Sequence, residues 1–126
     1  MKEFITVMKA LSDPNRVKIV KMLQLGTRCV CEVQAALGIS QPTVSKHLKI
    51  LEGAGLVDRK QKGLWAHYSL ANGGRSPYAA SLLGNLVHWL ADDPGVRDVI
   101  EKGEAFHETL CETAGQADIS SGGNIT

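Results

Sequence analysis

The sequence predicts a mainly α (α+β) domain in which several short helices carry a small β-hairpin. Apolar residues recur at helical spacing along much of the chain, only three residues separate two of the short helices, and two strand-like segments around a polar turn follow. With 126 residues, the chain has room for one hydrophobic core. A helix-turn-helix followed by a hairpin is typical of a winged helix-turn-helix, which is the fold class that we expect.

The first two helices are indicated by their apolar stripes and by one start signal. Residues 4–11 predict a short amphipathic helix. Asp13 and Pro14 predict the start of a second helix, because an Asp side chain accepts hydrogen bonds from free amides and proline pre-sets the first helical residue. Gly26 ends that helix. The two stripes consist of Phe4, Val7, Met8, Leu11, Val17, Val20 and Leu23.

The helix-turn-helix follows. Residues 31–37 predict a short helix that ends at Gly38, and Ser40 can cap the next helix. Pro42 is tolerated in the first turn of this second helix, which ends at Gly53. Its buried stripe is formed by Val44, Leu48 and Leu51. Beyond it, residues 56–60 and 64–70 read as two strands of a wing, joined by the polar turn 61–63.

The last part of the chain predicts two more helices and a tail. A helix over residues 78–91 has an apolar face broader than a small domain needs on one side, so core packing and a dimer interface are both open. A final helix is expected over residues 96–111. We expect residues 1–112 to form a winged-helix DNA-binding and dimerisation domain, and residues 113–126, rich in Gly and Ser, to be a disordered tail.

Charge is divided unequally along the chain. Residues 1–70 contain eleven Lys or Arg against five Asp or Glu, whereas residues 71–126 contain three against eight, so the net charge of +1 combines a +6 segment with a −5 segment. A basic segment of this kind favours binding of a polyanion. No apolar run is long enough for a membrane span and the start does not resemble a signal peptide, so we expect a cytoplasmic protein that binds no membrane. Its three cysteines are then expected to be reduced, without disulfides.

The helix that begins after Ser40 is the candidate recognition helix. Its exposed polar side chains could hydrogen-bond base edges and phosphates in a major groove, although a solvated helix face would look similar. Cations on the wing would add phosphate contacts, and Gln41, Ser45 and His47 would select the sequence. The candidate DNA-binding residues are Ser40, Gln41, Thr43, Ser45, Lys46, His47, Lys49, Arg59, Lys60 and Lys62.

Cys29 and Cys31 form a second candidate site. Residues two apart point about 200° from one another on a helix, but they share a face in an extended segment. Two thiolates could therefore bind one ion only if the start of this helix is extended or opens. Arg28 and the helix amino terminus would favour the thiolate form. For this pair taken alone, buried structural cysteines are the better prediction.

Residues 11–70 contain four motifs that occur together: Asp-Pro-Asn-Arg at the second helix, Cys-Val-Cys-Glu-Val, Ser-Gln-Pro-Thr-Val-Ser-Lys-His-Leu-Lys-Ile-Leu and Gly-Leu-Val-Asp-Arg-Lys. With these motifs, this segment resembles the ArsR/SmtB family of bacterial metal-responsive repressors. It implies a homodimeric repressor that binds double-stranded operator DNA until its ligand binds. The Cys-Val-Cys placement is similar to that of the arsenite and antimonite sensors, which implies a ligand role for Cys29 and Cys31.

The sequence also departs from that family. Gln34 stands where arsenic sensors often have a further cysteine, and no cysteine precedes Cys29. We hypothesise that Cys111 supplies the third sulfur, since soft ions select thiolates, although a lone structural cysteine is equally open. The zinc and nickel or cobalt sites of the family are not matched, so solvated or capping roles are expected for His88, Asp92, His107 and Glu108.

The expected function is that of a metalloid-responsive repressor. It would release its operator when As(III) or Sb(III), acting as inducer, binds the cysteines, and no organic cofactor is expected. A thiol-based redox-sensing regulator and a sensor of another soft metal such as Cd(II) are the alternatives. An enzyme is not expected, because no βαβ pattern surrounds the cysteine pair. A winged helix that binds other proteins is a further alternative.

Overall fold

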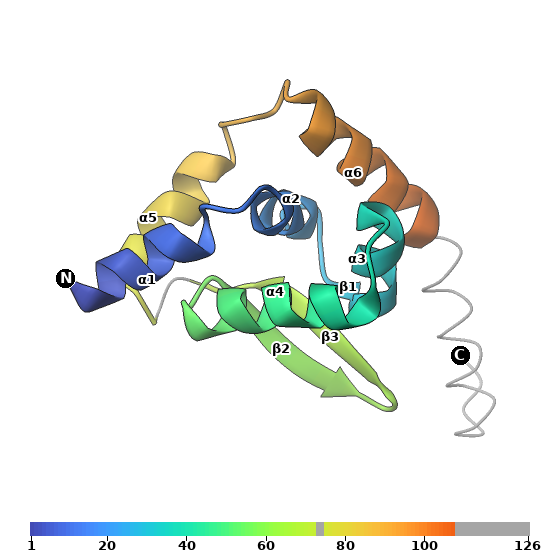
Figure 1. The fold of residues 1–126 in the computed structure, drawn as a ribbon, viewed down its shortest axis with the longest axis horizontal. Helices are drawn as coiled ribbons and strands as arrows, with labels where there is room; N and C mark the ends of the chain where they lie inside the picture. Colours follow the sequence, from blue (N-terminus) through green and yellow to red (C-terminus); the bar gives the residue numbers. More distant parts are fainter. Residues whose placement is uncertain (73–74, 108–126) are drawn as a thin grey trace.

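A computed structural model describes residues 1–72 and 75–107 of the chain. These residues form six helices and a small antiparallel sheet, whose β2–β3 hairpin lies at one edge of the molecule beneath α4 (Figure 1). The elements in order are α1 (Lys2–Ala10), α2 (Pro14–Leu23), β1 (Arg28–Cys29), α3 (Val30–Leu37), α4 (Gln41–Gly53), β2 (Val57–Lys62), β3 (Trp65–Leu70), α5 (Pro77–Leu86) and α6 (Pro94–Phe106). The predicted winged helix-turn-helix is therefore confirmed.

Figure 1 shows how the helices are placed around the core. Helix α1 lies along α5, and at the opposite end α3 and α6 pack against one another. Helix α2 runs through the middle, and α4 lies over the base of the hairpin, whose tip projects away from the helices. The core is built from fully buried side chains of at least five elements, among them Val7, Ile19, Val20, Met22, Val33, Leu48, Leu51 and Val57.

The sheet has one strand more than the sequence predicted. Its order is β1-β3-β2, and the short strand β1 pairs Arg28 with Tyr68 and Cys29 with His67. The predicted hairpin is present, with β2 and β3 in register from Val57 opposite Leu70 onward. Because β1 is two residues long, it has no periodicity that could reveal it, yet it fixes the segment directly before α3.

Helix α4 agrees with its predicted boundaries. Ser40 is its N-cap, and the Ser40 side chain accepts a hydrogen bond from the Thr43 amide at 3.4 Å. Val44, Leu48 and Leu51 are buried as the periodicity predicted. Local capping and the apolar stripe therefore determine this helix.

The predicted extension of a helix to residue 91 is wrong, since α5 ends at Leu86. The Lys21 ammonium is almost fully buried and donates hydrogen bonds to the carbonyl oxygens of Leu86 (2.6 Å) and Trp89 (2.8 Å). Leu90 then adopts a positive φ of 64°, which is incompatible with a right-handed helix at this residue. Burial lowers the pKa of Lys21 below its ordinary value.

Helix α6 begins two residues earlier than predicted, because Asp93 caps it through the Val96 amide at 3.0 Å. The far end of the predicted helix 96–111, which includes Cys111, and the predicted tail 113–126 lie outside the described residues. No helix in the described part of the chain has the length and apolar character needed to cross a membrane.

Candidate DNA-binding surface and cysteine site

Helix α4 presents most of its predicted recognition residues to solvent. Gln41, Thr43, Ser45, Lys46 and Lys49 are exposed, whereas Val44, Leu48 and Leu51 of the same helix are buried. A polar, exposed helix face next to a projecting hairpin has the shape that fits a major groove. The Ser40 hydroxyl, in contrast, is engaged in capping and lies 2.8 Å from the Thr43 hydroxyl.

His47 differs from the other recognition candidates. It is half-buried, and its Nδ1 lies 3.2 Å from Nη1 of Arg16 on α2. The same guanidinium donates hydrogen bonds to the carbonyl oxygens of Ala10 (2.7 Å) and Lys9 (3.2 Å) at the end of α1. Arg16 thus joins α1 to the recognition helix, and His47 is held in that link.

The wing residues lie on β2 and are exposed. Lys60 and Lys62 are two residues apart on the strand, so these two lysines share a face, whereas Arg59 points to the other face. Arg59 donates a hydrogen bond to the Gln61 side chain at 2.7 Å. We refer to these three cations, together with the exposed Lys46 and Lys49 on α4, as the basic surface.

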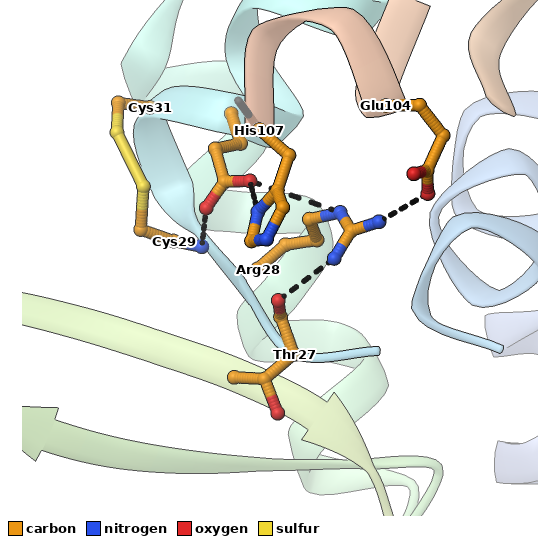
Figure 2. Close-up of polar contacts among 7 residues, drawn as sticks. Thr27, Arg28, Cys29, Cys31, Glu104 and His107 are labelled. Carbon is orange, nitrogen blue, oxygen red and sulfur yellow. Dashed lines mark hydrogen bonds and ion pairs between the residues drawn. A yellow bond between two sulfur atoms is a disulfide. The ribbon is translucent and has the colours of Figure 1, made fainter. Parts of the chain in front are cut away.

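The cysteine pair lies at the junction of β1 and α3. Cys29 is the N-cap of α3, with extended backbone angles (φ −84°, ψ 164°), whereas Cys31 lies in the first turn of the helix. The extended start that a shared ion requires is therefore present, and the two sulfur atoms converge. They are joined as a disulfide (Figure 2). The expectation of free thiols without a disulfide is wrong for this structure.

A polar cluster, buried at Arg28 and Glu32 and partly exposed at Glu104 and His107, holds the base of this site. We define the cluster as Arg28, Glu32, Glu104 and His107. Glu32 is fully buried, and its Oε1 accepts a hydrogen bond from the Cys29 amide at 2.9 Å. Its Oε2 lies 2.5 Å from Nδ1 of His107 and 3.7 Å from Nε of Arg28.

The remaining contacts of the cluster involve Arg28, which is only 4% exposed. Its guanidinium lies 2.6 Å from a Glu104 oxygen on α6 and donates to the Thr27 carbonyl at 3.0 Å (Figure 2). Arg28 was expected to favour the thiolate form of the cysteines. Its charge is instead compensated by the carboxylates of Glu32 and Glu104. His107 was expected to be solvated or to cap a helix; it is the C-cap residue of α6, and its side chain, which is 38% exposed, also binds Glu32.

The third candidate ligand, Cys111, lies outside the described residues. Within residues 1–72 and 75–107, no group of three or more His, Cys, Asp or Glu side chains could hold a metal ion. His88 and Asp92, which the sequence analysis excluded from a metal site, are both exposed on the segment after α5. The described ligand candidates are thus the two sulfur atoms of the pair.

Exposed apolar side chains gather at the end of the molecule where α1 and α5 lie together. Phe4 and Tyr78 meet there edge to face, with ring centroids 5.5 Å apart, and Trp89 is 51% exposed. A pocket of about 310 Å³ opens beside them, with mainly apolar walls. The exposed apolar residues of this face are Phe4, Ile5, Met8, Tyr78, Val87, Trp89 and Leu90. Leu83 and Leu86 instead point into the core, so the predicted broad face divides between core and surface.

Glu32 and Arg16 were not identified as site residues from the sequence. A Glu three residues after an N-cap is a known signal for a reciprocal cap, but here the N-cap is a cysteine rather than Ser or Thr. Arg16 belongs to the Asp-Pro-Asn-Arg motif, which predicts only the start of α2. Its contact with His47, 31 positions away, leaves no signal in that motif.

Comparisons with known proteins agree with this architecture. The model of the arsR family of bacterial regulatory proteins matches residues 13–59. The arsenical resistance operon repressor of Escherichia coli (strain K12) is 43% identical over 99 residues, which cover 76% of this chain and 80% of that protein.

Two solved structures have a similar fold. The homodimeric winged helix-turn-helix DNA-binding domain of Mb0332 from Mycobacterium bovis, a possible ArsR-family regulator, has a TM-score of 0.60 and 30% identity, covering 73% of this chain and 81% of that one. HlyU from Vibrio cholerae N16961 has a TM-score of 0.60 and 26% identity, covering 73% and 95%. With its winged helix, basic surface and cysteine pair, the chain belongs to the ArsR/SmtB family of DNA-binding transcriptional repressors.

Proposed function

We propose that this repressor binds operator DNA as a homodimer and releases it when As(III) or Sb(III) is bound by the thiolates of Cys29 and Cys31. The observation that carries the proposal is the convergence of these two sulfur atoms at the start of α3, the helix directly before the recognition helix. The name of the similar Escherichia coli protein, an arsenical resistance operon repressor, supports the choice of ligand.

The ligation chemistry requires the reduced pair. A cellular dithiol or glutathione supplies two electrons and two protons to the disulfide and becomes a disulfide itself. Arsenous acid then exchanges two hydroxyl groups for two sulfurs: two As–S bonds form, two As–O bonds break, and each thiol proton leaves with a hydroxyl as water. Cys111, if it approaches the pair from either subunit, would replace the third hydroxyl in the same way.

Release of DNA requires that the ligand binds the weak-binding conformation better. Changing an operator from mostly occupied to mostly free needs a difference of several kcal/mol in ligand affinity between the two conformations. Helix α3 packs on both α4 and α6, so a change in its first turn acts on the recognition helix through direct packing. In a dimer, a small rotation of each α4 would disturb the spacing between the two half-sites.

The DNA contacts are assigned to α4 and the wing. The basic surface would bind phosphates, and the exposed Gln41, Thr43 and Ser45 would reach base edges. His47 remains a predicted contact, although it would have to leave or share its bond to Arg16. Binding that depends on phosphate contacts weakens with salt.

The exposed apolar face formed by α1, α5 and the segment after α5 supports dimerisation. Contiguous apolar side chains rimmed by polar residues are typical of protein interfaces. A two-fold dimer through this face would place two copies of α4 on one operator, with half-sites separated by about one helical turn of DNA or a multiple of it.

A second candidate function is favoured by the disulfide itself. A peroxide could oxidise the pair: one thiolate attacks the peroxide, water leaves, and the second thiol displaces a further water as the disulfide forms, so two electrons pass from the sulfurs to the peroxide. The repressor would then sense oxidants through Cys29 and Cys31. The DNA-binding surface is the same in both candidates.

One experiment separates the two candidates. The reduced protein is bound to DNA from its own promoter and examined by band shift with arsenite, antimonite, cadmium, zinc or peroxide. We expect release with arsenite or antimonite in the presence of excess glutathione. Release by peroxide alone would favour the redox sensor, and release by cadmium alone would make the protein a sensor of that metal. A Cys111→Ser variant that binds arsenite as tightly as wild type would remove Cys111 from the site.

A further inference from the structure

Glu32 has an environment that helix capping does not require. It lies in the first turn of α3 and is 0% exposed, although a glutamate at this position of a helix is normally exposed to solvent. Burying a carboxylate is costly unless charged and hydrogen-bonding partners compensate it. A neutral side chain could satisfy the same backbone amide without that cost.

The partners of Glu32 connect two parts of the molecule. One oxygen accepts from the Cys29 amide at 2.9 Å, and the other lies 2.5 Å from Nδ1 of His107 at the end of α6. Figure 2 shows Cys29, Arg28 and His107 around this one carboxylate, with Arg28 continuing to Glu104. Residues on β1, α3 and α6 thus meet at a single side chain.

The contact with Cys29 has a geometric consequence for the sulfurs. The Cys29 backbone is extended while Cys31 is helical, and this change of conformation between them lets residues two apart bring their side chains together. The Glu32 carboxylate binds the amide of Cys29, the residue at which the change occurs. His107 and Arg28 in turn limit where the carboxylate can move.

We propose that Glu32 is a positioning residue for the cysteine pair: it holds Cys29 extended so that the two sulfurs remain at bonding distance, and His107 fixes it to α6. The inference deepens the proposed function and rests on it where ligand binding is concerned. The convergence of the sulfurs is a property of the chain itself, whichever ligand or oxidant the pair meets.

The equilibrium between the pair and glutathione tests this directly. In the exchange, the Cys29–Cys31 disulfide and two glutathiones give the dithiol and glutathione disulfide, so its constant measures how well the chain holds the two sulfurs together. All proteins carry Cys111→Ser, which leaves only the pair to titrate. Arsenite affinity is then measured on the reduced proteins from the ultraviolet absorbance of the sulfur–arsenic bonds.

We expect Glu32→Ala to shift the glutathione equilibrium toward the dithiol by about tenfold or more, as the loss of one hydrogen bond to a charged group implies. Arsenite affinity should fall in parallel. Glu32→Gln retains an oxygen for the Cys29 amide and should recover most of the glutathione equilibrium. Asp93→Ala is the matched control, because it removes a cap at the opposite end of α6 without touching the cluster; both readouts should stay within twofold of the parent.

Several results would overturn the proposal. One is a folded Glu32→Ala variant whose glutathione equilibrium equals that of the parent. Another is an equal shift of this equilibrium in Asp93→Ala, because the shift would then result from lower stability and not from the position of Glu32. If urea denaturation shows that Glu32→Ala does not fold, the glutathione equilibrium is measured for His107→Ala instead. A shift of about threefold toward the dithiol is expected, and an unshifted equilibrium would refute the proposal. If arsenite fails to bind even the wild type, which retains Cys111, while Glu32→Ala shifts the glutathione equilibrium of the Cys111→Ser parent, the proposed function fails and this inference stands.

Discussion

Lys62→Gln on the wing tests the DNA-binding surface most simply. Lys62 is exposed at the end of β2, next to the tip of the hairpin. If it contacts one phosphate in each protomer, the variant loses two contacts per dimer. Each contact contributes about 0.9 to the slope of log K against log salt, so the slope should become less steep by about 1.8.

This change is large enough to measure. Between 50 and 200 mM salt, a slope difference of about 1.8 means that wild type loses roughly tenfold more affinity than the variant. The assay is fluorescence anisotropy of labelled operator DNA across a salt series. Lys102→Gln is the control, because it removes an equal charge from α6, where Lys102 pairs with Asp98 at 3.1 Å. A Lys62→Gln slope equal to that of Lys102→Gln would refute the placement of the wing on DNA.

Three further predictions concern stability and assembly. Burial raises the pKa of Asp13, but backbone hydrogen bonds from Arg16 and Asn15 outweigh it and hold this pKa below its ordinary value of 3.8. The charged carboxylate therefore stabilises the fold above about pH 4, and this stabilisation is lost as pH falls through the folded pKa. The stability difference between wild type and Asp13→Asn at pH 7 should therefore vanish in acid; a difference unchanged down to pH 2 contradicts this. Lys21→Met should cost about 2 kcal/mol in urea denaturation, since two buried carbonyls lose their donor, and unchanged stability would exclude this role. Trp89→Glu should shift sedimentation from dimer toward monomer, and an intact dimer would move the interface elsewhere.

Features set by neighbouring residues could be predicted from the sequence. Ser40, Pro42 and the stripe of Val44, Leu48 and Leu51 define α4, and each signal acts within a few positions along the chain. The hairpin followed in the same way from two short strands and a polar turn. The exposure of the basic surface could also be predicted, because it follows from which positions of α4 and β2 are left outside the buried positions of each element.

Features set by distant residues could not be predicted. Helix α5 ends early at Leu86, where Lys21, 65 positions before it, donates hydrogen bonds to the carbonyl oxygens of Leu86 and of Trp89 beyond the helix. His107 contacts Glu32, which lies 75 positions before it in the chain. Neither contact leaves a periodic pattern, since it depends on how the helices pack.

The cysteine pair illustrates both cases. Residue spacing alone predicts that Cys29 and Cys31 could bind one ion only if the start of the helix is extended, and Cys29 meets this condition. What produces this condition is strand β1 together with the buried Glu32. Both depend on partners in β3 and α6, which only the fold supplies.

The most direct test of the account is an arsenite titration of the reduced protein on labelled operator DNA, followed by anisotropy, for wild type and Cys29→Ser. The account predicts that stoichiometric arsenite releases wild type and lowers its operator affinity by at least a hundredfold. Cys29→Ser should bind the operator normally without arsenite and remain bound when it is added. Release of Cys29→Ser at the same arsenite concentration as wild type would contradict the account.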